Sequence, residues 1–316
     1  MSRRGFLAAA VLCAVCLLCG CSSFQKSLFE CSMSIERRLS KLQPKTLQAG
    51  GLTFSYLERT GTGETIVLLH GFGADKDNWV RFVRRLPGEY RVIAIDLPGH
   101  GSSTRDAQTT YTIEFIVQGF AAAAEELGLE RFHLAGNSMG GYVGVLYSAH
   151  NPGKVLTLCL IDPAGAASPV PSDLQLAVER GENPLVPKSR DDFDILLSYG
   201  FHNRPFIPWP IADVLADRYV ERSVFNEKMW TDIHRHWEDI SRYLGALDMP
   251  VLLVWGDRDR ILHVSSVSVY RRHIPHLETV ILEECGHLPM LELPKVTARR
   301  YVSFLKDKSA GTELGR

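Results

Sequence analysis

Residues 132–141 read Phe-His-Leu-Ala-Gly-Asn-Ser-Met-Gly-Gly, and this stretch is the strongest indication of the fold. It begins with a short apolar run that is typical of a buried strand, and a helical pattern follows it. Between the two, Gly136, Ser138 and Gly140 have the G-x-S-x-G spacing of a sharp strand–turn–helix bend. In so tight a turn, a side chain at position 136 or 140 would collide with the neighbouring backbone. The bend therefore predicts that the Ser138 hydroxyl stands above the end of a sheet, placed to act as a nucleophile.

Short apolar runs recur on both sides of this bend. They cover residues 65–69, 91–95, 132–135, 155–161, 251–255 and 279–282. Near-continuous apolar character over so few residues is typical of parallel strands that are covered on both faces. Helical patterns separate the runs. This alternation predicts an α/β fold with a doubly wound, mostly parallel sheet, built from residues 51–165 and 247–308, with a tail at 309–316.

The segment at 166–246 contains no run of this kind. Its length of roughly 80 residues is too great for a loop, and its patterns are helical. We expect a helical lid over the carboxyl ends of the strands, where such sheets bind ligands. Apolar lid side chains either line a substrate pocket or pack the lid on the core; those assigned to the pocket are Leu196, Phe201, Phe206 and Ile207, with Leu197 and Trp209 as further candidates.

A candidate base follows the last apolar run, in the sequence Glu284-Cys285-Gly286-His287. Gly286 permits a tight loop, so the His287 imidazole can reach the bend and take the serine proton. A carboxylate is needed to orient the imidazole. Asp257 and Asp259 both follow the run at 251–255, and Asp162 follows the run at 155–161, so these residues leave three candidates.

These motifs resemble those of the α/β-hydrolase superfamily. Within it, they are similar to bacterial lipases of the fifth lipolytic family and to membrane-anchored monoacylglycerol lipases. The resemblance covers about residues 51–308 and is carried by residues 70–79, 136–141, 161–165, 206–208 and 284–287. The order serine, acid, histidine along the chain is also that of the superfamily. The resemblance implies the α/β-hydrolase fold, hydrolysis of carboxylic esters of lipids or small molecules, and neither cofactor nor metal.

The resemblance also implies roles for individual residues. Asp259 is the acid that orients His287, because the superfamily's acid corresponds to the position two residues beyond Asp257. The backbone N–H of Phe72, in the His-Gly-Phe-Gly loop after the first apolar run, joins that of Met139 in an oxyanion hole.

The first 20 residues are typical of a signal peptide. Arg3 and Arg4 precede an apolar run at 6–19, which is shorter than the ~20 residues of a membrane span. The run ends in Leu18-Cys19-Gly20-Cys21, which resembles a bacterial lipobox. This implies cleavage before Cys21, acylation of Cys21 with palmitate-type chains, and a lipid anchor on a membrane of the cell envelope. By resemblance to enteric lipoproteins, Ser22 in place of Asp implies the outer membrane rather than the inner one.

Residues 21–50 are interpreted as a tether. Apolar residues spaced by three and four predict one apolar helical face, formed by Phe24, Leu28, Cys31, Ile35, Leu39 and Leu42. This face either packs on the catalytic domain or lies on the membrane near the anchor.

Composition excludes some classes of function. The 316 residues carry a formal net charge of −1, so no surplus of Lys and Arg is available to neutralise nucleic-acid phosphates. Of the seven cysteines, only Cys31, Cys159 and Cys285 lie beyond the signal and lipobox. Their spacing predicts neither a disulfide framework nor a zinc site.

Two other functions stay open. Carbon–carbon bond hydrolases of aromatic ring-cleavage products share the Ser-Met-Gly-Gly bend, although an anchor outside the cell suits their pathway poorly. A non-catalytic surface lipoprotein could also reuse the fold for binding. Relatives that decay in this way lose the nucleophile or the base, and here both are present.

Overall fold

A single eight-stranded sheet forms the centre of the computed structural model, which describes residues 22–313. The strand order is β1-β2-β4-β3-β5-β6-β7-β8. The strands are β1 (Gln43–Ala49), β2 (Leu52–Arg59), β3 (Thr65–Leu69), β4 (Arg91–Ile95), β5 (Phe132–Asn137), β6 (Val155–Ile161), β7 (Val251–Gly256) and β8 (Leu277–Leu282). β1 and β2 run antiparallel to their neighbours and the other strands are parallel.

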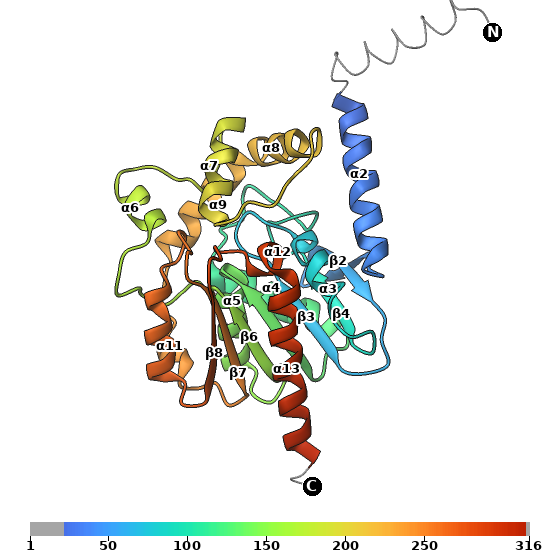
Figure 1. Cartoon of the computed structure of the whole chain (residues 1–316), viewed down its shortest axis with the longest axis vertical. Helices are drawn as coiled ribbons and strands as arrows, with labels where there is room; N and C mark the ends of the chain where they lie inside the picture. Colours follow the sequence, from blue (N-terminus) through green and yellow to red (C-terminus); the bar gives the residue numbers. More distant parts are fainter. Residues whose placement is uncertain (1–21, 314–316) are drawn as a thin grey trace, which may run out of the picture.

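Helices cover both faces of this sheet (Figure 1). One face packs on α4 (Ile113–Glu126), α5 (Met139–His150) and α11 (Val267–His273), the other on α3 (Val80–Val83), α12 (Pro289–Glu292) and α13 (Pro294–Glu313). Strand residues alternate between the two cores: Val67 and Leu69 enter the first, Ile66 and Leu68 the second. All four are fully buried, which explains the continuous apolar run at this strand. The doubly wound, mostly parallel sheet predicted from the sequence is confirmed.

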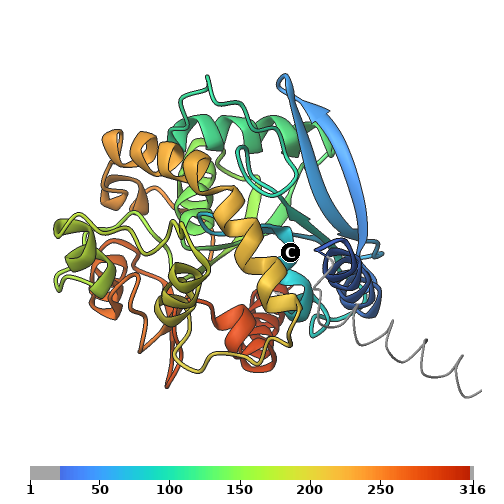
Figure 2. The ribbon, with the colours of Figure 1, turned by 90° about the horizontal axis from the view of Figure 1, so that it is seen from above.

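The segment between β6 and β7 is helical. It contains α6 (Asp173–Glu179), α7 (Arg190–Gly200), α8 (Ile211–Glu221), α9 (Ser223–Arg235) and α10 (Ser241–Leu244). Figures 1 and 2 show α6 to α9 gathered above one end of the sheet. The lid has a small apolar core of its own, formed by Phe193, Leu197, Phe201 and Ala216. The lid is therefore a separate layer that covers the ends of the parallel strands.

The N-terminal segment differs from the expected tether. Helix α2 spans Ser22–Leu39, but Gln43–Ala49 is an edge strand that pairs with β2. Its residues are mostly exposed and polar, so an apolar alternation is missing from the sequence. Gly50 and Gly51, both with positive φ, close the hairpin, and this dipeptide was the signal that could have revealed it.

The predicted apolar face of α2 is largely exposed to solvent. Phe24, Leu28, Ile35 and Leu39 are exposed, and so is Cys31, whereas Leu42, just past the helix, is buried. Another side of α2 makes the contacts. Arg37 forms a bidentate ion pair with Asp77, with hydrogen bonds of 2.7 and 2.6 Å, and the buried Phe29 ring packs under the Arg218 guanidinium of α8. The helix thus touches both the core and the lid.

Residues 1–21, and with them the predicted signal peptide and Cys21, lie outside the described residues. Within residues 22–313, no helix has the length and apolar character needed to cross a membrane.

Candidate active site

Ser138 occupies a strained bend between β5 and α5. Its backbone has φ 53° and ψ −119°, a conformation that L residues rarely adopt. Neighbouring glycines make the bend possible: a Cβ on Gly136 would lie 2.2 Å from the Gly140 carbonyl oxygen, and one on Gly140 would lie 2.3 Å from that of Leu69. Ser138 stands at the N-cap of α5, yet its side chain makes no capping hydrogen bond. The hydroxyl is therefore available for chemistry, at the positive end of a helix dipole.

The loop after β3 presses directly on this bend. A Cβ on Gly71 would lie 3.1 Å from the Ser138 Cβ, so a side chain at this position would crowd the bend. Met139 is the first residue of α5, a position whose N–H has no acceptor in its own helix. No backbone or side-chain acceptor in residues 22–313 pairs with the N–H of Phe72. The two predicted oxyanion donors thus belong to segments that meet at Ser138.

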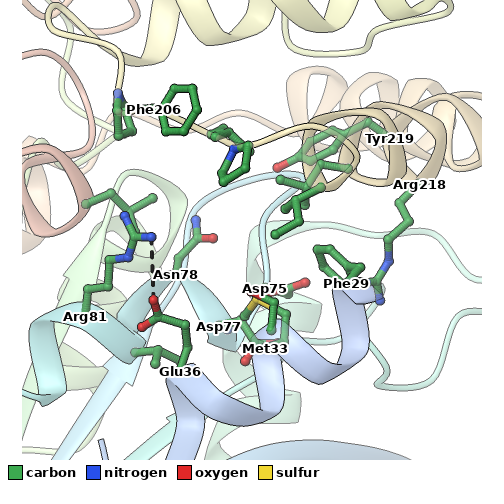
Figure 3. Close-up of a pocket in the computed structure, with 18 of the residues that line it drawn as sticks. Phe29, Met33, Glu36, Asp75, Asp77, Asn78, Arg81, Phe206, Arg218 and Tyr219 are labelled. Atoms are coloured by element: carbon green, nitrogen blue, oxygen red, sulfur yellow. Dashed lines mark hydrogen bonds and ion pairs between the residues drawn. The ribbon is translucent and has the colours of Figure 1, made fainter. Parts of the chain in front are cut away.

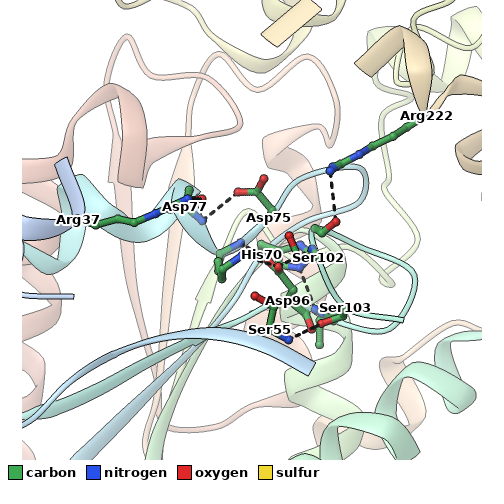
Figure 4. A network of polar contacts seen from close by, with 12 residues as sticks. Arg37, Ser55, His70, Asp75, Asp77, Asp96, Ser102, Ser103 and Arg222 are labelled. Atoms are coloured by element: carbon green, nitrogen blue, oxygen red, sulfur yellow. Dashed lines mark hydrogen bonds and ion pairs between the residues drawn. The ribbon is translucent and has the colours of Figure 1, made fainter. Parts of the chain in front are cut away.

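A buried polar network holds the loop after β3 in place (Figure 4). The His70 Nδ1 lies 2.8 Å from the Gly71 oxygen, and the Nε2 accepts a hydrogen bond of 3.0 Å from the Leu97 N–H. Burial lowers the pKa of His70 to about 4, so the ring is neutral and cannot act as a proton store near pH 7. Asp96 accepts from the backbone N–H and the ammonium of Lys76, each at 2.7 Å. His70 and Asp96 therefore hold the loop in place.

His287 contacts Asp259, and not Asp257. Its Nδ1 lies 2.7 Å from the Asp259 Oδ2, and both side chains are buried. The Asp259 Oδ1 accepts the N–H groups of Ile261 and Leu262, at 2.8 and 2.9 Å, which fixes the carboxylate in the loop after β7. Asp257 is partly exposed and accepts a long bond from Cys285 N–H. Of the two aspartates after β7, Asp259 is therefore the one placed to orient the imidazole.

Asp162, the third candidate acid, lies beneath this pair. Its Oδ1 accepts the Gly256 N–H at 2.9 Å, and its buried Oδ2 has no partner among the described residues. Burial, followed by the charge of Asp259, raises the pKa of Asp162 well above its usual value. Asp162, Asp259 and His287 offer atoms within 4.8 Å of one another, the spacing of a possible metal cluster. However, the 2.7 Å contact between Asp259 and His287 is that of a hydrogen bond, which requires a proton where an ion would sit.

Ser138 and His287 line the same cavity, of about 180 Å³, which we call the Ser138 cavity. In the described part of the chain, no direct hydrogen bond joins the Ser138 Oγ to the imidazole. Such contacts are often long before substrate binds. The apolar walls come mainly from the lid and the His287 loop and include Phe193, Leu196, Leu197, Phe201, Ile207, Leu215, Leu288 and Leu291.

Three of the four predicted pocket residues line the Ser138 cavity, whereas Phe206 does not. Its side chain is 85% exposed and borders a neighbouring cavity. Residues 205–208 form no helix or strand, and their exposure alternates, so Ile207 faces inward and Phe206 outward. Trp209 is 58% exposed and donates its indole N–H to Asp213. Apolar character alone could not separate these neighbours.

Two polar residues join the His287 loop to its surroundings, and sequence reasoning missed both. Asn137, inside the bend, donates to the His287 carbonyl oxygen at 3.1 Å. Glu292 accepts the Gly286 N–H at 2.9 Å and the Asn203 N–H of the lid at 2.6 Å. Glu292 thus links the His287 loop to the lid. The only sequence signal was its position, five residues after His287 and on the next helix.

Known proteins resemble this chain over most of its length. A model described as "Alpha/beta hydrolase family" matches residues 66–300. "Lipase 1" of Psychrobacter immobilis is 33% identical, with 85% of this chain and 86% of the relative covered. "Monoacylglycerol lipase ABHD6" of Homo sapiens is 30% identical, with 80% and 78% covered. A solved structure titled "a membrane phospholipase A, a novel bacterial virulence factor" is 40% identical, with a TM-score of 0.90 and 98% and 99% covered.

Proposed function

The chain belongs to the alpha/beta hydrolase family, and from this premise we propose that it hydrolyses carboxylic esters of lipids through Ser138, His287 and Asp259. The names of its relatives support an enzyme of the lipase and esterase kind, since two are lipases and one is a phospholipase A. The observation that carries the proposal is the 2.7 Å contact between His287 and Asp259, on the wall of a cavity that also holds the strained Ser138.

In the first half of the reaction, the Ser138 Oγ attacks the ester carbonyl carbon while His287 Nε2 takes the hydroxyl proton. The N–H groups of Phe72 and Met139 stabilise the negative charge on the carbonyl oxygen. Each such donor contributes about 10²–10³ to kcat in enzymes of this type. As the carbon–oxygen bond breaks, the imidazolium returns the proton to the leaving alcohol, and the acyl group stays on Ser138.

In the second half, a water molecule attacks the acyl-enzyme and gives its proton to His287. The bond to Ser138 breaks, the serine oxygen recovers the proton, and the carboxylic acid leaves. Asp259 keeps the Nδ1 proton in place and stabilises the imidazolium in both halves. The apolar lid residues around Ser138 provide space for an acyl chain.

The test uses the full chain in a mild detergent with p-nitrophenyl esters of two to sixteen acyl carbons. We expect hydrolysis that is lost in Ser138→Ala, together with covalent labelling of Ser138 by a fluorophosphonate. Absence of both hydrolysis and labelling would support a protein that only binds its ligand. Turnover of a ring-cleavage dienoate faster than of any ester would instead support the carbon–carbon bond hydrolase.

We also propose that Cys21 carries the lipid anchor and that the protein resides in the bacterial cell envelope, in the outer rather than the inner membrane. The similarity to a membrane phospholipase supports membrane association. Cys21→Ser is expected to stop acylation, which mass spectrometry of the N-terminal peptide would detect. Unchanged mass and unchanged sedimentation with membranes would contradict the anchor.

A further inference from the structure

A second cavity, of about 350 Å³, lies between α2 and the lid (Figure 3). We call it the α2–lid cavity. It adjoins the Ser138 cavity, because six residues line both: Asn78, Phe201, Ile207, Leu215, Tyr219 and Leu291. A molecule whose ester bond lies at Ser138 could therefore extend past these shared side chains toward α2.

Charges in the α2–lid cavity are unevenly paired. Glu36 pairs with Arg81 and Arg84, and Asp77 pairs with Arg37, so these acids are already neutralised. Asp75 is used as an N-cap and accepts the Asp77 N–H at 2.9 Å. Two more arginines also line the cavity, on the lid side. Asp75 keeps its negative charge, but these two arginines outnumber it, so the balance favours an anionic ligand.

These arginines stand at the end of α8. Arg218 and Arg222 are four residues apart and so share one helix face, where like charges repel. The negative end of the helix dipole offsets this repulsion only within the last turn. The Arg218 guanidinium stacks on Phe29 and lies 3.8 Å from the exposed Glu30. Arg222 donates to the Gly101 carbonyl oxygen at 3.2 Å and forms no ion pair with any described residue.

Arg105 adds a third positive charge to the group. It follows Gly101 by four residues in the loop that Arg222 contacts, and no hydrogen bond or ion pair with another described residue satisfies it. The Arg105 side chain is largely exposed, and partial burial, followed by the charge of Arg222, lowers the pKa of its guanidinium. Arginines that form so few ion pairs with carboxylates are typical of sites that bind phosphate.

The Tyr219 hydroxyl is a neutral hydrogen-bond donor at the boundary of the two cavities. Tyr219 lines both and follows Arg218 directly. Burial, and after it the charge of Asp75, raises the pKa of Tyr219 to about 12, so its hydroxyl keeps its proton at pH 7. It can donate a hydrogen bond to a glycerol or phosphate oxygen on the way from Ser138 to the arginines.

We propose that the α2–lid cavity binds the phosphate group of a glycerophospholipid, held by Arg218 and Arg222, with Arg105 adding positive charge from the neighbouring loop, while the acyl ester of the same molecule lies at Ser138. The mostly apolar walls accommodate the glycerol backbone and acyl carbons, and the arginines provide the polar end that a neutral glyceride would leave unused. The position of the ester rests on the function proposed above, whereas recognition of the phosphate does not.

The experiment measures binding without turnover. The full chain carrying Ser138→Ala is titrated in detergent micelles with dioctanoyl phosphatidylglycerol and with dioctanoylglycerol, which has the same tails and no phosphate. Calorimetry gives the ratio of the two dissociation constants. We expect the phospholipid to bind at least about tenfold more tightly, as charge-assisted hydrogen bonds to phosphate predict.

Adding Arg222→Met or Arg105→Met is expected to lower this ratio about three- to tenfold, and the two together to abolish it. Arg222→Lys should keep part of the preference, because it retains the charge and loses the forked geometry. Arg190→Met is the matched control: it removes a positive charge from the lid that is paired with Asp217 and lines neither cavity, so the ratio should not change.

Equal affinity for the two lipids, or a ratio that both arginine variants leave unchanged, would overturn the proposal. Inorganic phosphate should compete only at millimolar concentrations. Phosphate that binds as tightly as the phospholipid would assign the site to the free anion and so contradict lipid recognition. Failure of the proposed function would appear separately, as a wild-type protein that binds the phospholipid with the expected ratio and hydrolyses no ester.

Discussion

The Ser138 bend and the lid are held together by different interactions. At the bend, close backbone contacts leave no room for a single added carbon at Gly136 or Gly140. In the lid, side chains make the contacts: ion pairs such as Arg190 with Asp217 join the helices on the exposed side, around a small apolar core. Exposed ion pairs contribute little to stability, about 0–1 kcal/mol each. The reacting groups therefore lie on a tightly packed support, while the side chains around the rest of a substrate lie on a more loosely held layer of helices.

The largest expected effect comes from crowding the bend. Gly140→Ala would place a Cβ 2.3 Å from the Leu69 oxygen, so we expect loss of activity and destabilisation by more than about 3 kcal/mol, measured by chemical unfolding. Gly245→Ala in the lid is the control, because no atom lies within 4 Å of its added Cβ and its backbone is helical. That change should be neutral or stabilising. Equal effects of both would remove the contrast between bend and lid.

Asp259→Asn tests the support of the imidazole. The amide keeps the shape but no longer holds the correct tautomer of His287, so kcat should fall about 10⁴-fold while the protein stays folded. Asp257→Asn, two residues away and without contact to His287, should change kcat less than about threefold. The measurement is steady-state hydrolysis of a soluble ester. A larger loss at 257 than at 259 would reverse the assignment.

Glu292→Ala tests the junction of the two regions. Without the carboxylate, the Gly286 and Asn203 N–H groups lose their acceptor, and the His287 loop is held less firmly. We expect kcat to fall about tenfold, since small misplacements of a catalytic group are costly. Glu292→Gln, which keeps one acceptor oxygen, should recover part of the rate. The exposed Glu278→Ala serves as a control for surface charge.

Ile207→Ala tests the lid wall. Loss of apolar contact in the Ser138 cavity should raise KM for an octanoate ester about threefold or more and change acetate hydrolysis little. Val224→Ala, at a side chain that is 84% exposed, should leave both values unchanged. A uniform change for all acyl lengths would show that Ile207 only packs the lid.

The smallest effect concerns stability and pH. The pKa of Asp162 is raised in the folded protein, so its contribution to stability is fully present below the unfolded value near 3.8 and is lost as the pH rises toward the folded value. Asp162→Asn removes this titration. The free energy of unfolding of the variant, relative to wild type, should therefore increase from pH 4 to pH 8. A constant difference over this range would show that Asp162 titrates normally.

The parallel strands could be predicted because each is buried on both faces, which makes its sequence continuously apolar. Ser138 could be predicted because Gly136 and Gly140 flank it with a spacing that few other structures require, and His287 because Gly286 precedes it in the loop after the last strand. The edge strand β1 could not, since exposed residues such as Gln43 and Lys45 carry no apolar pattern. The hydrogen bonds of Asn137 and Glu292 join segments that are distant in the sequence, so no local pattern predicts them. The same holds for the orientation of the Ile207 side chain toward the Ser138 cavity.

Helix α2 forms one wall of the α2–lid cavity through Phe29, Met33 and Glu36. A recombinant fragment that began at β1 would lack this wall, so the α2–lid cavity would open to solvent. The Arg218 guanidinium would also lose its contact with the Phe29 ring. Such a fragment would thus differ from the longer chain in the ligands that it accepts. Substrate profiles measured on such fragments would therefore describe an α2–lid cavity that is wider and more exposed to solvent than the cavity in the chain that includes α2.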